Sequence, residues 1–476
     1  MLPNLRTIGG FFVSQGVSMI IMKFGGTSVD GAARMRGIAE IISLAREKNP
    51  QTPIVVTASA LSQVTEQLLS AARDAVGGIE TYVETYLKLL KRHQKICLDL
   101  AEQESDTVEQ LNCDIEYILE DFLAMCQGIF LLRELSPRAL DRISSIGERL
   151  SCRILAYALS RFAAPARYFG AQHLLVTDDQ FGNATPLMKP SRAAVRRALL
   201  PQIKKGVIPV VTGFVGATEN GEITTLGRGG SDYTATILAN LLDASEVWIY
   251  KEIDGVMSAD PRIVPDAQTL RELSYSEAAE LSHFGAKVLH PKAMLPVIGK
   301  NIPVRIKNSF NPSFPGTLIT TKVERSRTTV KALSAIGDLC LVNVQGHGML
   351  GIPGIAARTF LAVARANSNV LLITQSSSEQ TICLVIAQKE ARPVQKELKQ
   401  EFKYEILRGD IDDIELIQNM GIIAIVGDGM QGTPGIAARI FGALGEHQIN
   451  IIAIAQGSSE RNISVVVPKE EIPLYI

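Results

Sequence analysis

The sequence predicts an α/β protein whose mainly parallel sheet lies between helical layers, followed by two small α+β modules. In the first 321 residues, short apolar runs alternate with amphipathic helical patterns, which is typical of a buried parallel sheet. The last third contains an internal repeat: residues 346–386 align with residues 427–467 at a constant offset of 81, and 20 of the 41 positions are identical. Each copy, with the apolar run before it, predicts strand–helix–strand–strand and a second helix, a ferredoxin-like unit.

Composition limits the class of protein. The 476 residues are enough for several domains, and a net charge of −1 gives no electrostatic reason to expect nucleic acid as a partner. The six cysteines form no Cys-x-x-Cys pair, so we expect no disulfide framework and no metal site, and a reducing cytoplasm fits. We expect residues 1–18 to be an N-terminal extension rather than a signal peptide, and no later run is long and apolar enough to span a membrane.

The first candidate anion site is the turn that starts at Lys23, directly after a short apolar run. The paired glycines Gly25 and Gly26 let the backbone approach a phosphate, and Thr27 adds a hydroxyl at a helix start. Lys23 supplies the positive charge. The order of residues is neither that of a Walker A loop nor Gly-x-Gly-x-x-Gly.

A second glycine turn leads into a predicted helix that has Ser231 or Asp232 near its N-cap. Gly229 and Gly230 again allow close approach of a phosphate, Arg228 suits a carboxylate or phosphate, and Asp232 can bind an ammonium or a metal. Taken alone, this turn is equally compatible with an ordinary glycine-rich connection. Two such turns about two hundred residues apart suggest one polyphosphate held between two halves of one sheet.

Three further residues have both a structural and a functional interpretation. Ser59 and Thr65 flank a predicted helix start after a buried strand, where they either cap the helix or bind a small polar ligand. Glu148 lies in the first turn of another helix, where it either interacts with the helix dipole or binds an ammonium group. Residues 80–135 predict a helical insertion, in which His93 is expected at the solvated surface.

The later part of the chain adds a loop and the domain boundaries. The predicted strand 246–250 ends at Lys251 in a turn-rich loop, the place where α/β folds bind ligands. The second module either follows the first or is inserted into it and interleaved with it. The predicted divisions are an extension (1–18), a catalytic domain (19–321), a linker (322–332), a first module (333–410) and a second module (411–476).

Four motifs together resemble those of the aspartokinases, and the repeat resembles the paired ACT domains of that family. The motifs are Lys23–Val29, Gly147–Glu148, Gly227–Tyr233 and Phe284–Pro291. The segments that begin at Gln375 and Gln456 are similar to the kinase and regulatory part of bifunctional aspartokinase–homoserine dehydrogenases. No dehydrogenase-like domain follows the repeat in this sequence, so the second activity is not expected of it.

The resemblance implies an amino acid kinase fold that phosphorylates the β-carboxylate of L-aspartate with ATP and Mg²⁺, the first step of the pathway to lysine, threonine and methionine. It implies that Lys23 contacts the transferred phosphoryl group and that Arg228 binds the α-carboxylate. Aspartate would be held toward the N-terminal half by Ser59, Thr65, Glu148 and Asp232. The implied nucleotide contacts are Gly25, Gly26, Thr27, Gly229, Gly230, Lys251, Met257, Arg262, Lys287 and Val288.

The sequence also departs from the family pattern. Many members have Trp-Thr-Asp where this chain has Tyr250-Lys251-Glu252, and many have an aromatic residue at the position of Met257. These positions are expected on the nucleotide side, so the departure concerns nucleotide contacts. The alternatives are another amino acid kinase and an amino-acid sensor that keeps the kinase fold without efficient catalysis.

The resemblance further implies feedback inhibition by an amino acid bound to the ACT modules, with threonine favoured over lysine. A purely structural role of the repeat in a dimer interface is the alternative. ACT modules often pair across chains, so a homo-oligomer is expected. The expected effector contacts are Gln375, Gln456, Asn369 and Asn450.

Overall fold

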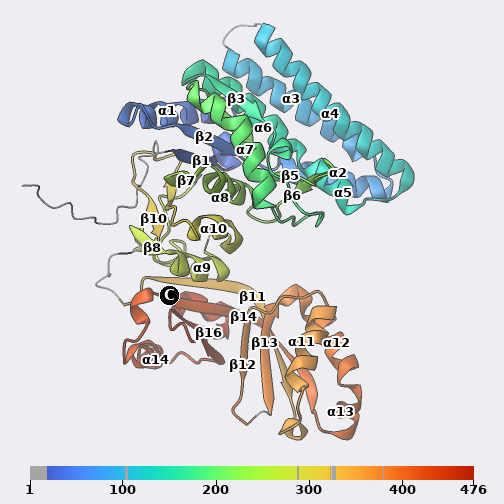
Figure 1. Ribbon diagram of the computed structural model, residues 1–476. Helices are drawn as coiled ribbons and strands as arrows, with labels where there is room; N and C mark the ends of the chain where they lie inside the picture. The colour runs from blue at the N-terminus through green and yellow to red at the C-terminus, as the bar shows by residue number, and fades with distance from the viewer. Residues whose placement is uncertain are drawn as a thin grey trace, which may run out of the picture. The chain divides into compact units, whose positions relative to one another are not determined.

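The computed structural model describes residues 19–101, 106–286, 289–321, 323, 329–378 and 380–475 (Figure 1). The chain forms two compact units. The first contains the residues up to Asp254 together with Lys292–Pro315, and the second contains Gly255–Pro291 and Gly316–Ile476. The bounds of these two units do not coincide with those of the domains that the sequence pattern suggests. Most of the expected linker, residues 322–332, lies outside the described residues.

The first unit is built on six parallel strands, which confirms the expected fold class. In spatial order they are β3 (Ala166–Phe169), β4 (Ile208–Thr212), β2 (Ile54–Ala58), β1 (Ile20–Phe24), β7 (Glu246–Lys251) and β9 (Val304–Asn308). Because all of them run the same way, the carboxyl ends of β1, β2, β4 and β7 meet at one edge of the sheet.

Strand β1 shows how the sheet is buried on both faces. Its alternate residues Ile20, Met22 and Phe24 belong to one hydrophobic core with helices α1 (Ala32–Lys48) and α6 (Ile146–Phe162). Ile21 and Lys23 point to the opposite face, which α8 (Gly230–Leu242) covers. The period of two therefore directs the single charged residue of this strand toward the start of α8.

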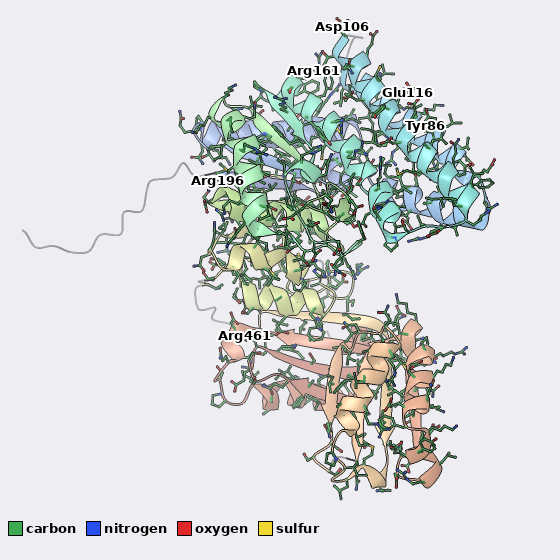
Figure 2. All side chains as sticks on the ribbon, turned by 45° about the vertical axis from the view of Figure 1, so that its right-hand side comes forward. Tyr86, Asp106, Glu116, Arg161, Arg196 and Arg461 are labelled. Atoms are coloured by element: carbon green, nitrogen blue, oxygen red, sulfur yellow. The ribbon has the colours of Figure 1, made fainter. Side chains whose placement is uncertain are left out.

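The other helices of this unit complete the two layers. Figure 1 shows α3 and α4 as a long antiparallel pair beside the sheet, and Figure 2 marks Tyr86 on α3 and Glu116 on α4. The expectation for His93 was wrong: its ring is fully buried in α3, and burial lowers its pKa to about 4. The bounds are α2 (Val64–Gly77), α3 (Thr81–Ala101), α4 (Asp106–Leu132), α5 (Pro137–Ser144), α7 (Met188–Lys204) and α10 (Pro291–Ile298).

The second unit contains a short parallel pair and a six-stranded antiparallel sheet. The pair is β8 (Glu272–Ser274) with β10 (Thr317–Thr320), and α9 (Tyr275–His283) follows β8. The sheet order is β12-β13-β11-β14-β16-β15. Its strands are β11 (Ala332–Gln345), β12 (Leu372–Gln375), β13 (Thr381–Ala387), β14 (Asp413–Val426), β15 (Ala453–Gln456) and β16 (Asn462–Pro468), and its main helices are α11 (Ile355–Arg365), α12 (Ala391–Glu401) and α14 (Ile436–Glu446).

The two copies of the repeat share their long strands. Strands β11 and β14 pair antiparallel along their lengths, from Ala332 opposite Val426 to Gln345 opposite Asp413. The second half of β11 also pairs with β13, and the second half of β14 pairs with β16. Each copy therefore uses half of the other copy's long strand as its fourth strand, so the strands of the two modules are interleaved.

Candidate active site

A cavity of about 490 Å³ lies in the first unit. It brings together eight of the residues that the sequence analysis selected, from β1, the β2–α2 turn, α6 and the start of α8. These are Lys23, Ser59, Thr65, Glu148, Arg228, Gly229, Gly230 and Asp232. The lining also includes Gly182, Phe214, Gly227 and Ser231, which the sequence analysis did not select as site residues.

A buried ion pair lies beside this cavity. The Lys23 ammonium is 2.6 Å from Oδ1 of Asp232, and the Lys251 ammonium is 3.5 Å from Oδ2 of the same carboxylate. Burial raises the pKa of Asp232, but the two ammonium groups outweigh that effect and hold the pKa below its usual value. Asp232 is therefore a carboxylate at neutral pH, and the three groups together carry a net positive charge.

Helix α8 starts earlier in the chain than expected. The helix begins at Gly230, so the N-cap is Gly229 rather than Ser231 or Asp232. Gly229 has φ 72° and ψ 15°, a left-handed conformation that favours glycine. The earlier start places Asp232 in the first turn, where the helix dipole favours a carboxylate and the first N–H groups lack partners within the helix.

The turn after β1 is held close to the turn after β2. Gly26 lies so near this second turn that a Cβ on it would be 2.8 Å from the carbonyl oxygen of Ala60. The carbonyl oxygen of Phe24 accepts a hydrogen bond from the Ser59 N–H at 3.1 Å. Gly25, Gly26 and Thr27 follow Lys23 directly but are not among the residues that line the cavity, so their phosphate contacts stay a prediction.

Glu148 is a buried carboxyl group with an unused oxygen. It is 4% exposed, lies in the first turn of α6, and its Oε2 has no hydrogen-bond partner among the described residues. Burial raises the pKa of Glu148 to about 8, against smaller opposing effects from backbone N–H groups and Lys23. A ligand ammonium at this oxygen would favour the ionised form.

Asp141, which the sequence analysis did not select, supports one wall of the cavity. Its carboxylate accepts hydrogen bonds from the N–H groups of Gly182 and Thr225, both at 2.8 Å, and from Oγ1 of Thr225 at 2.7 Å. These bonds join α5 to the Gly182 loop and to β6 (Ile223–Thr225), which leads into the glycine turn. An acidic residue in a short helix was the only sequence signal.

Two of the expected nucleotide contacts belong to the second unit, and two more lie outside the described residues. Met257 and Arg262 belong to the second unit, where Met257 Sδ accepts a hydrogen bond from Thr269 Oγ1 at 3.4 Å and Arg262 pairs with Asp260. Lys287 and Val288 lie outside the described residues. The roles expected for all four stay predictions.

The second unit contains two equivalent smaller pockets, one in each copy of the repeat. The pocket of the first copy has a volume of about 350 Å³ and includes Gln375, at the end of β12. The pocket of the second copy has a volume of about 370 Å³ and includes Gln456, at the end of β15. Both pockets include a Gly-x-Pro-Gly turn and the first residue of a helix. Asn369 and Asn450 are exposed and do not line them.

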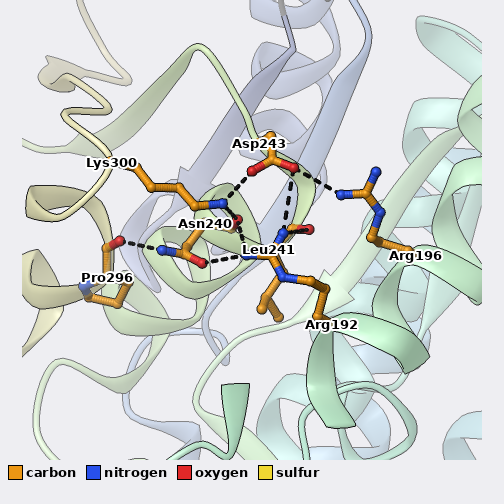
Figure 3. Close-up of polar contacts among 7 residues, drawn as sticks. All are labelled: Arg192, Arg196, Asn240, Leu241, Asp243, Pro296 and Lys300. Carbon is orange, nitrogen blue, oxygen red and sulfur yellow. Dashed lines mark hydrogen bonds and ion pairs between the residues drawn. The ribbon is translucent and has the colours of Figure 1, made fainter. Parts of the chain in front are cut away.

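A cationic cluster holds the other end of α8 (Figure 3). Arg192 from α7 donates to the carbonyl oxygen of Asn240 at 3.1 Å and to its side-chain oxygen at 3.0 Å. Asp243, the C-cap residue, forms ion pairs with Arg196, at 2.9 Å, and with Lys300. Cations beside the last carbonyl groups of a helix stabilise it, so this cluster anchors the helix that carries Asp232.

Comparisons with known proteins agree with this architecture. The amino acid kinase family model matches residues 18–308, and an ACT domain model matches residues 342–402 and 423–474. E. coli aspartokinase III, in a crystal structure with aspartate and ADP, is 30% identical with a TM-score of 0.79, over 96% of this chain and 98% of that chain. The fold and the cavity thus define a protein with an amino acid kinase domain followed by ACT domains.

Sequence relatives narrow this class. Aspartokinase 2 of Arabidopsis thaliana is 33% identical over 457 residues, which cover 95% of this chain and 81% of the relative. The chain belongs to the aspartokinases of the amino acid kinase family. It is also 34% identical to bifunctional aspartokinase/homoserine dehydrogenase 2 of Arabidopsis thaliana, but the match spans only 50% of that relative's length. Among the described residues, no helix combines the length and the hydropathy needed to cross a membrane.

The anchor at the end of α8 leads to a stability prediction. Asp243 has φ 57° and ψ 46°, a left-handed conformation that glycine tolerates and alanine does not. Asp243→Gly and Asp243→Ala both remove the ion pairs, so we expect both variants to unfold more easily than the wild type. Asp243→Ala should lose about 1 kcal/mol more than Asp243→Gly. Urea unfolding of the two variants side by side measures this difference, and equal stability would contradict the backbone argument.

Proposed function

We propose that this chain is an aspartate kinase that transfers the γ-phosphoryl group of ATP to the β-carboxylate of L-aspartate, giving 4-phospho-L-aspartate. One observation carries the proposal: a single cavity is lined by the ion-paired Lys23 and Asp232, by Arg228, and by Glu148, whose Oε2 has no hydrogen-bond partner among the described residues. The Lys23–Asp232 pair suits a phosphoryl group, Arg228 suits a carboxylate, and Glu148 suits an ammonium group. The E. coli relative with this fold is described in complex with aspartate and ADP.

The chemistry needs alignment and charge neutralisation more than acid–base catalysis. The β-carboxylate of aspartate is already an anion at neutral pH, so no general base has to create the nucleophile. The transferred phosphoryl group spreads negative charge over three oxygens. Lys23 and the N–H groups at the start of α8 provide positive potential fixed in advance, which is the kind of stabilisation that a developing charge requires.

The residues of the cavity also suggest how aspartate is oriented. Arg228 would bind the α-carboxylate through its planar, two-pronged guanidinium group. Glu148 and Asp232 would receive the α-ammonium, while Ser59 and Thr65 would line the remaining wall. With both ends of the amino acid bound, the β-carboxylate would face Lys23.

ATP and Mg²⁺ fit the groups that are present. Gly25, Gly26, Thr27, Gly229 and Gly230 would present backbone N–H groups to the phosphates, and Met257, Arg262, Lys287 and Val288 would contact the nucleotide. The described residues hold no group of three or more potential metal ligands, which suits Mg²⁺ because that ion is often held mainly by phosphates and water. When bound, Mg²⁺ neutralises charge on the phosphate oxygens.

The equivalent pockets of the second unit are proposed to bind a feedback amino acid, with threonine favoured over lysine. In each pocket the helix start offers N–H groups to a carboxylate, and Gln375 or Gln456 offers an amide to a polar side chain. The pocket of the second copy also includes Glu460, whose counterpart in the first copy, Glu379, lies outside the described residues. Asn369 and Asn450 would contribute only if a partner copy in a homo-oligomer brought a ligand to them. A relative from E. coli is described with lysine, which makes lysine the control effector.

Hydroxamate formation tests the function directly. With ATP, Mg²⁺ and hydroxylamine, we expect aspartyl hydroxamate from L-aspartate and at most trace product from L-glutamate, whose longer side chain misplaces the carboxylate. Threonine should suppress the reaction. Absence of turnover, with threonine still bound, would instead favour a sensor that keeps the kinase fold.

Arg228→Ala tests the assigned carboxylate contact. We expect the KM for aspartate to rise by roughly 100-fold, since a charge-assisted bidentate contact contributes about 1.5–3 kcal/mol. The KM for ATP should change less than threefold. Steady-state kinetics with each substrate varied in turn measures both values, and an unchanged KM for aspartate would refute the role.

Glu148 predicts that aspartate binding depends on pH. The pKa of about 8 means that Glu148 is mostly protonated at pH 6, whereas an ammonium ligand requires the carboxylate. Binding below pH 8 therefore releases a proton, and the dissociation constant should fall on the order of 50-fold from pH 6 to pH 8 and then level off. Calorimetry in buffers of different ionisation enthalpy detects the released proton. Glu148→Gln should bind weakly with no such dependence, and a flat wild-type profile would exclude this contact.

The effector pockets give a calorimetric prediction. Threonine should bind two sites per chain, with Gln375→Ala weakening one site and Gln456→Ala the other, each by roughly tenfold because one hydrogen bond is lost. The variant with both substitutions should lose most of the heat of threonine binding. Binding of lysine but not threonine would reverse the assignment of the effector.

A further inference from the structure

Strand β7 ends with a lysine that joins the charge cluster of the active site. The Lys251 ammonium lies 3.5 Å from Oδ2 of Asp232, while Lys23 already contacts Oδ1 at 2.6 Å. The two ammonium groups thus lie beside different oxygens of one carboxylate. Two cations around one carboxylate in a site of low dielectric favour the arrival of a further anion.

The position of Lys251 indicates which anion this is. Lys251 contacts Asp232 but is not among the residues that line the cavity in which aspartate is proposed to bind. Its side chain is 23% exposed, against 9% for Lys23, so Lys251 is the more accessible of the two ammonium groups. A direct role in holding aspartate is therefore not supported, and a role toward the phosphate is.

The backbone of Lys251 is tied to the turn that follows Lys23. Tyr250 is paired with Phe24 across the parallel strands, and their rings stack with centroids 4.6 Å apart. The Lys251 carbonyl oxygen accepts hydrogen bonds from the N–H of Ser309, at 3.0 Å, and from its Oγ, at 3.2 Å. Ser309 Oγ is also 2.9 Å from Ser28 Oγ in the turn after β1. The two lysines therefore extend from neighbouring strand ends that are joined by one serine.

We propose that Lys251 is a second cation for the transferred phosphoryl group, acting with Lys23 and held ready by Asp232; this inference rests on the proposed kinase function. In the free protein, Asp232 lies between the two ammonium groups and offsets their repulsion. Burial lowers the pKa of Lys251 and Asp232 opposes that effect, and a phosphoryl group between the lysines would add further stabilisation to both charges. This role makes the nucleotide contact that the resemblance implied for Lys251 more specific.

Lys251→Met tests the proposal because it keeps the length and the apolar part of the side chain and removes the charge. We expect kcat for aspartyl phosphate formation to fall by about 10- to 100-fold, as is typical when one stabilising group of a transition state is removed. The KM for aspartate should stay within twofold. Lys251→Arg, which keeps the charge, should recover most of kcat, and that recovery separates a charge effect from a packing effect.

Lys307→Met is the matched control. Lys307 is a buried lysine on β9 that lies opposite Tyr250 in the sheet, and its ammonium donates to the carbonyl oxygen of Phe314. Loss of the Lys307 ammonium group should leave kcat within twofold of the wild-type value. Thermal unfolding of every variant shows whether a loss of activity is a loss of folded protein, and Lys251→Gln takes the place of Lys251→Met if the latter does not fold.

The outcomes separate the two proposals. An active wild type with an unchanged kcat in Lys251→Met would overturn the inference and leave Lys251 as a structural partner of Asp232. A rise in the KM for aspartate without a fall in kcat would overturn it as well, because Lys251 would then act in substrate binding. A wild type with no aspartate-dependent turnover would refute the proposed function itself. A selective loss of kcat with recovery by arginine would support the inference.

Discussion

The contact on which the active site depends is the buried ion pair between Lys23 and Asp232. These residues are more than two hundred positions apart, and they meet because β1 ends where α8 begins. Leaving either charge buried without its partner would cost about 3–5 kcal/mol. The pair therefore holds the strand and the helix in one arrangement, and it places a cation beside the helix start before any ligand arrives.

Helix α8 is fixed at both of its ends. Its first turn has glycines and a carboxylate, and its last turn is surrounded by Arg192, Arg196 and Lys300. The charges at both ends of α8 interact favourably with the helix dipole, which favours anions at the start and cations at the end. The helix is buried along nearly its whole length, so a shift at either end would disturb the packing between them.

The second unit has a comparable organising contact. Glu277 in α9 is fully buried, and its carboxylate accepts hydrogen bonds from the N–H groups of Ser274 and Asp428, both at 2.8 Å. Lys331 lies 3.3 Å from the same carboxylate. Asp428 begins the turn that leads into the pocket of the second repeat copy, and Lys331 directly precedes β11. Because β11 and β14 are shared between the two repeat copies, this contact holds strands that belong to both.

The sequence alone determined the elements whose cause is local. A short apolar run predicts β1, the glycine turns predict both strand–helix junctions, and the repeat at an offset of 81 predicts two equivalent modules with Gln375 and Gln456 in matching places. Only the tertiary structure decided that His93 is buried, that Asp141 supports the cavity wall, that Glu148 keeps an unpaired oxygen, and that Lys251 meets Asp232. Burial, pKa and charge pairing depend on which distant segments pack together, and no local pattern contains that information.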